Sequence, residues 1–355
     1  MTTVPPPTRE AIGSTPGSGA GNRRRPTSVR VLTVVVLLIL IGIAGIASVT
    51  LGVLDVTFDD VLAGLGGSEQ TTGQAAVVKR LPRTVLAMAV GAALAVSGAV
   101  MQGVTRNPLA DPEILGVNAG AALAVVIGMT FLGAGSNLSH IALAMVGAMA
   151  AAVFVYTLGS LGQGGATPLK LALAGAATAV ALSSLVSAIL LPRAQAMEEF
   201  RRWQVGGVGG GSWDKLQLMA PFLIVGALIC WFSARSLNSL ALGDAMAAGL
   251  GENITRARLV AAVGAVVLCA VCTAIAGPIG FVGLVIPHLC RVLVGVDHRW
   301  LIPVSALAGA ALLTVADVVG RLVGGTEEIQ VGIITAVIGA PFFIWIVRRQ
   351  KVREL

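Results

Sequence analysis

The chain has 355 residues, of which 56% are hydrophobic and only 12% are charged, and its formal net charge is +7. A water-soluble domain does not carry so much apolar and so little charged sequence, so the composition excludes an ordinary soluble protein. Positive charge does not indicate nucleic-acid binding here, because membrane proteins use basic loops to set their orientation. The sequence therefore predicts an all-α, polytopic membrane protein.

The N-terminal segment, residues 1–28, is rich in Pro, Gly, Ser and Thr, and we expect a disordered cytoplasmic tail. It contains Arg23, Arg24 and Arg25, which resemble the basic start of a signal peptide. The apolar run that follows is long and has no convincing small-residue cleavage site, so we interpret it as a retained first helix. Residues 29–355 would then form one membrane domain.

About ten apolar runs follow, each long enough to cross a hydrocarbon core of about 30 Å at 1.5 Å per residue. With both termini inside, 16 of the 24 Lys and Arg residues fall in inner segments and 8 in outer ones. This bias predicts a multi-pass protein of the cytoplasmic membrane with both termini in the cytoplasm. The expected membrane helices are 31–51, 84–104, 114–133, 139–159, 171–191, 216–234, 259–276, 279–295, 301–320 and 329–347.

Three interruptions of the apolar pattern differ from plain loops. Asn107–Pro112 contains two prolines, Gly206–Gly211 lies between Trp203 and Trp213, and Gly277–Gly280 separates two apolar runs by barely a turn. Irregular backbone at membrane depth is tolerated only where it is buried in protein or lines a cavity. These breaks favour transport over simple anchoring.

The sequence predicts no catalytic residue, no metal site and no cofactor. It lacks G-x-x-x-x-G-K-[ST], H-E-x-x-H and G-x-S-x-G, so ATP binding through a P-loop is excluded. Cys269 and Cys272 have C-x-x-C spacing but no second pair, which favours small apolar fillers over a metal site.

The clearest charge within a span is Asp317, four residues before Arg321, and this spacing predicts a structural ion pair. A secondary transporter would need buried ion-coordinating groups, and a membrane enzyme would need clustered ionisable residues. Neither is evident, so both classes are the weaker alternatives.

Seven short segments stand out together between about Arg80 and Arg348: Arg80–Thr84, Gly91–Gln102, Asn107–Pro112, Leu115–Val117, Leu240–Asp244, Gly280–His288 and Gly339–Phe343. In this order and spacing they resemble the permease family of ABC importers for iron–siderophores and vitamin B12. The resemblance implies ten helices per subunit and two permeases, identical or sibling, around a central pathway. It also implies separate ATP-binding cassette ATPases beneath and an extracytoplasmic substrate-binding protein outside.

The resemblance implies a transport permease rather than an enzyme, driven by ATP hydrolysis on the partner subunits. Its expected cargo is a ferric siderophore, because Arg201–Gly206 looks more like the siderophore members. Vitamin B12 and haem remain the alternatives within the family.

The resemblance also implies roles for individual residues. The outer arginines would dock the binding protein, with lipid-headgroup snorkelling as the alternative: Arg80, Arg83 and Arg321. The segment Leu240–Gly251 would couple to the ATPase, unless it is merely a polar-edged amphipathic loop, through Leu240, Gly243, Asp244, Ala248, Leu250 and Gly251. The loop Gly164–Pro168 and the Asn107 turn would form an inner gate through Asn107, Leu109, Thr167 and Pro168. The Trp203–Trp213 stretch would form the outer mouth.

Overall fold

The computed structural model describes residues 26–52, 54–133, 136–161, 167–324 and 327–350, and these are helical without a strand. Seven helices are long and apolar enough to span a membrane, and three shorter apolar helices bring the total to ten. The predicted all-α membrane fold is confirmed. The predicted tail lies almost wholly outside the described residues. The helices are α1 (Thr27–Thr50), α2 (Phe58–Leu65), α3 (Thr72–Thr105), η1 (Pro112–Leu115), α4 (Val117–Phe131), α5 (Asn137–Ser160), α6 (Pro168–Leu190), α7 (Ala194–Gln204), α8 (Trp213–Phe232), α9 (Ala234–Leu240), α10 (Asp244–Gly249), α11 (Ile254–Ala276), α12 (Val282–Val294), α13 (His298–Gly324) and α14 (Val331–Gln350).

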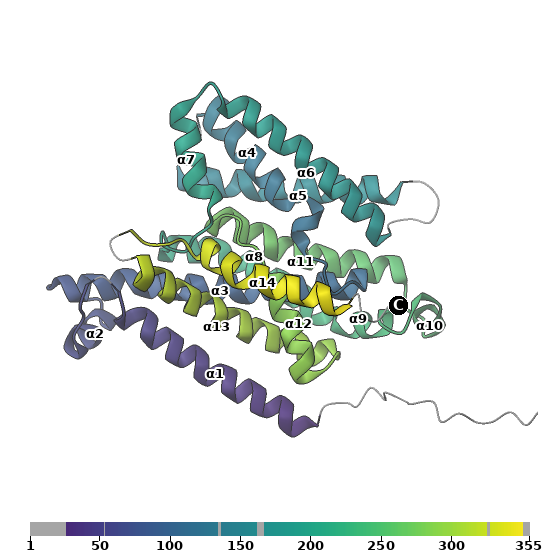
Figure 1. Ribbon diagram of the computed structural model, residues 1–355, viewed down its shortest axis with the longest axis horizontal. Helices are drawn as coiled ribbons and strands as arrows, with labels where there is room; N and C mark the ends of the chain where they lie inside the picture. The colour runs from purple at the N-terminus through teal and green to yellow at the C-terminus, as the bar shows by residue number, and fades with distance from the viewer. Residues whose placement is uncertain (1–25, 53, 134–135, 162–166, 325–326, 351–355) are drawn as a thin grey trace, which may run out of the picture.

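Helix α3 is the centre of the fold, packed by α13, α11 and α12. Helix α11 separates this group from a second group, α4 to α7, which lies at the top of Figure 1. Helix α1 packs along α13, and most of its side chains remain exposed for lipid. The predicted docking, gate and coupling segments project from both ends of the α3 group.

Glycines allow the closest helix crossings. A Cβ atom on Gly91 of α3 would overlap the carbonyl oxygen of Gly309 on α13, and Gly98 meets Gly283 of α12 in the same way. In lipid, helices associate through close van der Waals packing, which such small residues permit. The face of α3 that carries Gly91 and Ala95 therefore packs closely against Gly309 of α13.

Two helices are longer than the apolar pattern predicts. Helix α3 begins at Thr72 and continues through Pro82, so Arg80 and Arg83 lie on a helix and not in a loop. At 34 residues it is about 51 Å long, which exceeds a hydrocarbon core of about 30 Å. Helix α13 continues to Gly324, so Arg321 does not begin an outer loop as predicted. Charged residues hid both extensions from the hydropathy pattern, and in α3 Pro82 did so as well.

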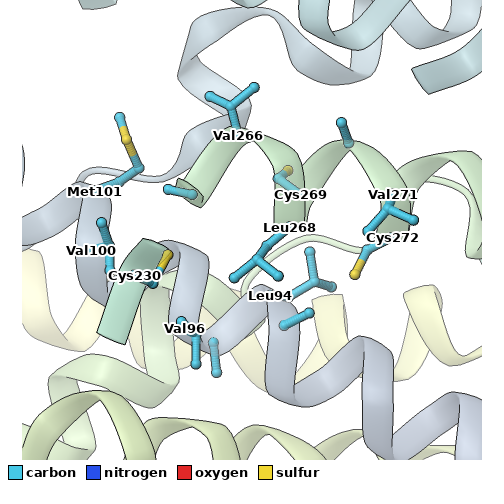
Figure 2. Close-up of a cluster of buried hydrophobic side chains, with 14 of the residues drawn as sticks. Leu94, Val96, Val100, Met101, Cys230, Val266, Leu268, Cys269, Val271 and Cys272 are labelled. Carbon is cyan, nitrogen blue, oxygen red and sulfur yellow. The ribbon is translucent and has the colours of Figure 1, made fainter. Parts of the chain in front are cut away.

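The four cysteines are buried and free. Figure 2 shows Cys230 beside Val100, Met101 and Leu268, in the core between α3, α8 and α11. Within the described ranges, no group of three or more His, Cys, Asp and Glu side chains could hold a metal ion. The cysteines pack as small apolar side chains.

Candidate functional site

Arg83 is the hub of an ionic cluster at one end of α3. Its Nε donates to both carboxylate oxygens of Asp317 at 3.1 Å, and its Nη2 donates to Oδ1 at 2.8 Å. Its Nη1 reaches Oε2 of Glu328 at 2.7 Å. The Asp317 side chain is 3% exposed and that of Glu328 is 42% exposed. Arg83 therefore joins a buried carboxylate to one at the surface.

Arg321 lies beneath this cluster. Its Nη2 is 3.2 Å from Oδ2 of Asp317, so the ion pair predicted from their spacing is confirmed. Its Nη1 donates to the backbone carbonyls of Ser48 and Leu51 at 3.0 and 3.2 Å. The Arg321 side chain is only 3% exposed. The prediction that Arg321 presents a free charge to a docking protein is wrong here, because α1 covers it.

Arg80 holds the C-terminal end of α1. Its guanidinium donates to the carbonyl oxygens of Val49, Thr50 and Leu54 at 3.0, 3.0 and 3.1 Å. The last carbonyls of a helix lack partners within it and carry partial negative charge. Arg80 and Arg321 thus satisfy the end of α1 from two neighbouring helices.

A hollow of about 280 Å³ lies over this cluster, lined in part by Lys79, Arg80, Arg83, Gly209 and Glu328. Gly209 belongs to the glycine-rich loop between Trp203 and Trp213. The loop is tied to the ends of α11 and α14 through Gly207 N to Ala276 O at 2.7 Å and Gly332 N to Gly206 O at 3.2 Å. The structure brings the predicted outer-mouth stretch and the outer arginines together.

At the opposite end of α3, the chain makes a tight turn. Arg106 adopts a left-handed conformation with φ 52°, which is uncommon for a residue other than glycine. The side chain of Asn107 accepts a hydrogen bond from the backbone N–H of Leu109 at 3.0 Å. Asp111 then caps η1 by accepting from the N–H of Glu113 at 3.0 Å. Asn107 is exposed and Leu109 half-buried, so both can face a pathway.

The other predicted gate segment begins α6. Thr167 caps this helix by accepting from the N–H of Lys170 at 3.4 Å, and Pro168 is its first residue. Gly164 to Ala166 of the same predicted gate lie outside the described residues. Further along α6, a Cβ atom on Gly175 would overlap the carbonyl oxygen of Ile114 in η1. The two gate segments are therefore connected through η1.

An apolar stripe is exposed at α10, made by Met246 within the helix, Leu242 just before it and Leu250 just after it. Leu242, Met246 and Leu250 are 56%, 62% and 67% exposed, whereas Ala247 on the opposite face is buried. Ala248 is exposed, and Gly243 and Gly251 flank the helix with φ values of 106° and 81°. Such an exposed stripe is typical of a protein-docking surface.

Two predicted details of this segment change. Leu240 is fully buried at the end of α9, so the prediction that it contacts an ATPase is wrong. Its side chain anchors the segment in the core instead. Leu242 and Met246 were missed, although their spacing with Leu250 was visible in the sequence.

Asp244, the first residue of α10, pairs with two arginines. It forms a very short contact with Arg106 and lies 3.0 Å from Arg258 of α11. Nearby, Asn238 of α9 donates to Asp297 at 2.7 Å and accepts from the N–H of His298 at 2.9 Å. Burial opposes ionisation of Asp297, but hydrogen bonds from Asn238 and the Arg299 N–H hold the pKa of Asp297 below its ordinary value. Helices α9 and α10 are thus fastened to α3, α11 and α13.

A family model described as the FecCD transport family matches residues 36–349. The iron(3+)-hydroxamate import system permease protein of Bacillus subtilis is 41% identical over 90% of this chain and 84% of its own. The ferric enterobactin transport system permease protein of Escherichia coli is 42% identical over 90% of this chain and 96% of its own. This chain is a multi-pass membrane transport permease and belongs to the FecCD transport family.

A solved structure also resembles this chain. An inward-facing conformation of a metal-chelate type ABC transporter superposes with a TM-score of 0.77 at 29% identity, covering 90% of this chain and 99% of that one. The sequence resemblance to ABC importer permeases is confirmed by both comparisons.

Proposed function

We propose that this permease carries a ferric siderophore across the cytoplasmic membrane, driven by ATP hydrolysis on separate ATPase subunits. The observation that carries the proposal is the exposed apolar stripe of α10, joined through Asp244 to Arg106 at the inner turn. An exposed apolar surface next to the inner turn is suited to receive a separate ATPase subunit. By the charge bias, α10 and both termini lie in the cytoplasm.

The cargo assignment rests on relatives. The permeases named above for ferric hydroxamates and ferric enterobactin support a siderophore, whereas relatives named for hemin and cobalamin support the alternatives. Uptake of radiolabelled ferric hydroxamate, ferric catecholate, hemin and cobalamin into cells expressing the complete transporter would decide between them. Uptake of an iron–siderophore is expected, and uptake of hemin or cobalamin alone would refute the siderophore assignment.

A second permease would pack against α6. This helix exposes Ala177, Val180, Ser184 and Ser187, and Ser183 and Ser187 border a groove of about 550 Å³. Small residues favour close helix contact in lipid, and the hydroxyls offer a weakly polar surface to a passing solute. These features support a permease pair with a pathway between its subunits.

We further propose that an acidic binding protein docks over the hollow formed by Arg80 and Arg83, while Arg321 supports that site from below. Glu328 accepts a hydrogen bond from Nη1 of Arg83 on the surface side of this site. A docking carboxylate would compete with Glu328 for this guanidinium, because both need the same donor.

Replacing Glu328 by Gln is therefore expected to speed association of the binding protein by about two- to fivefold at low salt. Surface plasmon resonance on the purified permease complex would measure this. Glu327→Gln is the matched control, because it removes the same charge from an exposed neighbour. Equal acceleration by both variants would indicate only a general charge effect.

Opening the inner turn should cause a leak. Replacing Leu109 by Ala is expected to raise ATP-independent passage of cargo in liposomes, because the half-buried side chain narrows the pathway. Leu109→Ile keeps the side-chain volume, so the variant should not leak cargo without ATP. A tight barrier in a Leu109→Ala, Asn107→Ala double variant would remove these residues from the gate.

A further inference from the structure

The turn that follows α3 and the short helix α10 meet at one ion-pair network. Asp244 of α10 contacts Arg106 on one side and Arg258 on the other, and the three side chains are 48%, 34% and 28% exposed. Arg106 is the last residue before the predicted gate residue Asn107. Arg258 lies in the first turns of α11, away from that turn.

The Arg106 backbone is held in an unfavourable conformation. Its φ of 52° is one of two positive values among non-glycine residues in the described part of the chain. Such outliers persist only where surrounding contacts hold them, and the pair with Asp244 is one such contact. Movement of Asp244 therefore acts directly on the point where α3 ends.

The segment beyond Arg106 is built as one unit. Hydrogen bonds close the turn from Asn107 to Leu109 and Ala110, and Asp111 caps η1. In turn, η1 packs on α6 at Gly175, about two turns from Thr167 at the start of that helix. A displacement at Arg106 can thus reach both predicted gate segments through bonded and packed groups, as energetic coupling requires.

We propose that the Arg106–Asp244 ion pair transmits motion of α10 to the inner gate, and that Arg258 only anchors α10 to α11. The inference rests on the proposed function, since it assumes that an ATPase moves α10. Arg106 is accordingly a positioning residue that acts through the turn and does not touch cargo.

The test uses the complete transporter in proteoliposomes, with ATP hydrolysis and uptake of radiolabelled ferric siderophore measured together. Arg106→Gln is expected to leave ATPase co-purification and the melting temperature unchanged. It should lower cargo carried per ATP by about three- to fivefold, the effect of losing one partly exposed ion pair. Arg106→Gly should behave alike, because glycine adopts the left-handed conformation without strain. Arg106→Lys should recover part of the loss.

Arg258→Gln is the matched control, since it removes the other ion pair of the same Asp244 carboxylate. It should keep cargo per ATP close to wild type. An unchanged ratio in Arg106→Gln and Arg106→Gly, equal losses in the Arg106 and Arg258 variants, or loss of the ATPase from Arg106→Gln would each overturn the inference. If the wild-type complex shows no ATP-dependent uptake, the proposed function fails instead.

Discussion

Replacing Arg321 by Glu is expected to destabilise the folded permease by about 3–5 kcal/mol, the usual loss when one partner of a buried ion pair is removed. The substitution removes three hydrogen bonds to the Ser48 and Leu51 region of α1 and places a second carboxylate beside Asp317. The effect should appear as a lower melting temperature in detergent. A thiol-reactive dye would report it, because the four buried cysteines become accessible on unfolding.

Arg80→Gln is the comparison for this experiment, because Arg80 binds the same end of α1 but is more exposed and forms no salt bridge among the described residues. Its melting temperature should fall much less. If Arg321→Glu kept the wild-type melting temperature and only lost the binding protein, Arg321 would be a docking residue after all. The structural role assigned to its burial would then be wrong.

Replacing Ala248 by Trp is expected to abolish ATPase assembly. Ala248 is exposed on α10, close in sequence to the exposed Leu242, Met246 and Leu250, so the indole would prevent close approach of a partner. Position 243 is less suitable, since a φ of 106° would strain any side chain there. Affinity purification through the permease would measure the bound ATPase.

Leu62→Trp on α2 controls for adding a large side chain to an exposed apolar site, because Leu62 is 55% exposed and belongs to a different helix. It should retain the ATPase. Full retention by Ala248→Trp would show that α10 is not the contact surface.

The apolar runs were sufficient to predict the seven helices long enough to span a membrane and the three shorter apolar helices, because length and hydropathy determine them locally. They failed at helix ends. The sequence Lys79–Arg83 has the charge and proline of a loop, yet α3 passes through it; at 34 residues α3 is longer than a hydrocarbon core, so it can place charged turns outside. Helix ends in such positions depend on tertiary partners that the hydropathy pattern does not contain.

The partners of the arginines could not be predicted either. The i,i+4 spacing of Asp317 and Arg321 was visible, but Arg321 also binds Ser48, which is 273 residues away in sequence. Positive charge outside the membrane looked like docking capacity, but two of the three outer arginines, Arg80 and Arg321, cap the end of α1. The Arg106–Asp244 pair, separated by 138 residues, was likewise invisible before folding. The α10 stripe, by contrast, was local and detectable.

Whether ATP hydrolysis drives the import can be tested by a single transport measurement. Proteoliposomes holding the permease, its ATPases and its binding protein would be loaded with ATP or with a non-hydrolysable analogue, and initial uptake of ferric siderophore recorded. Uptake only with hydrolysable ATP, unaffected by collapsing the proton and sodium gradients, is the result we expect. Uptake that persists without ATP and follows an imposed ion gradient would contradict the account and favour a secondary transporter.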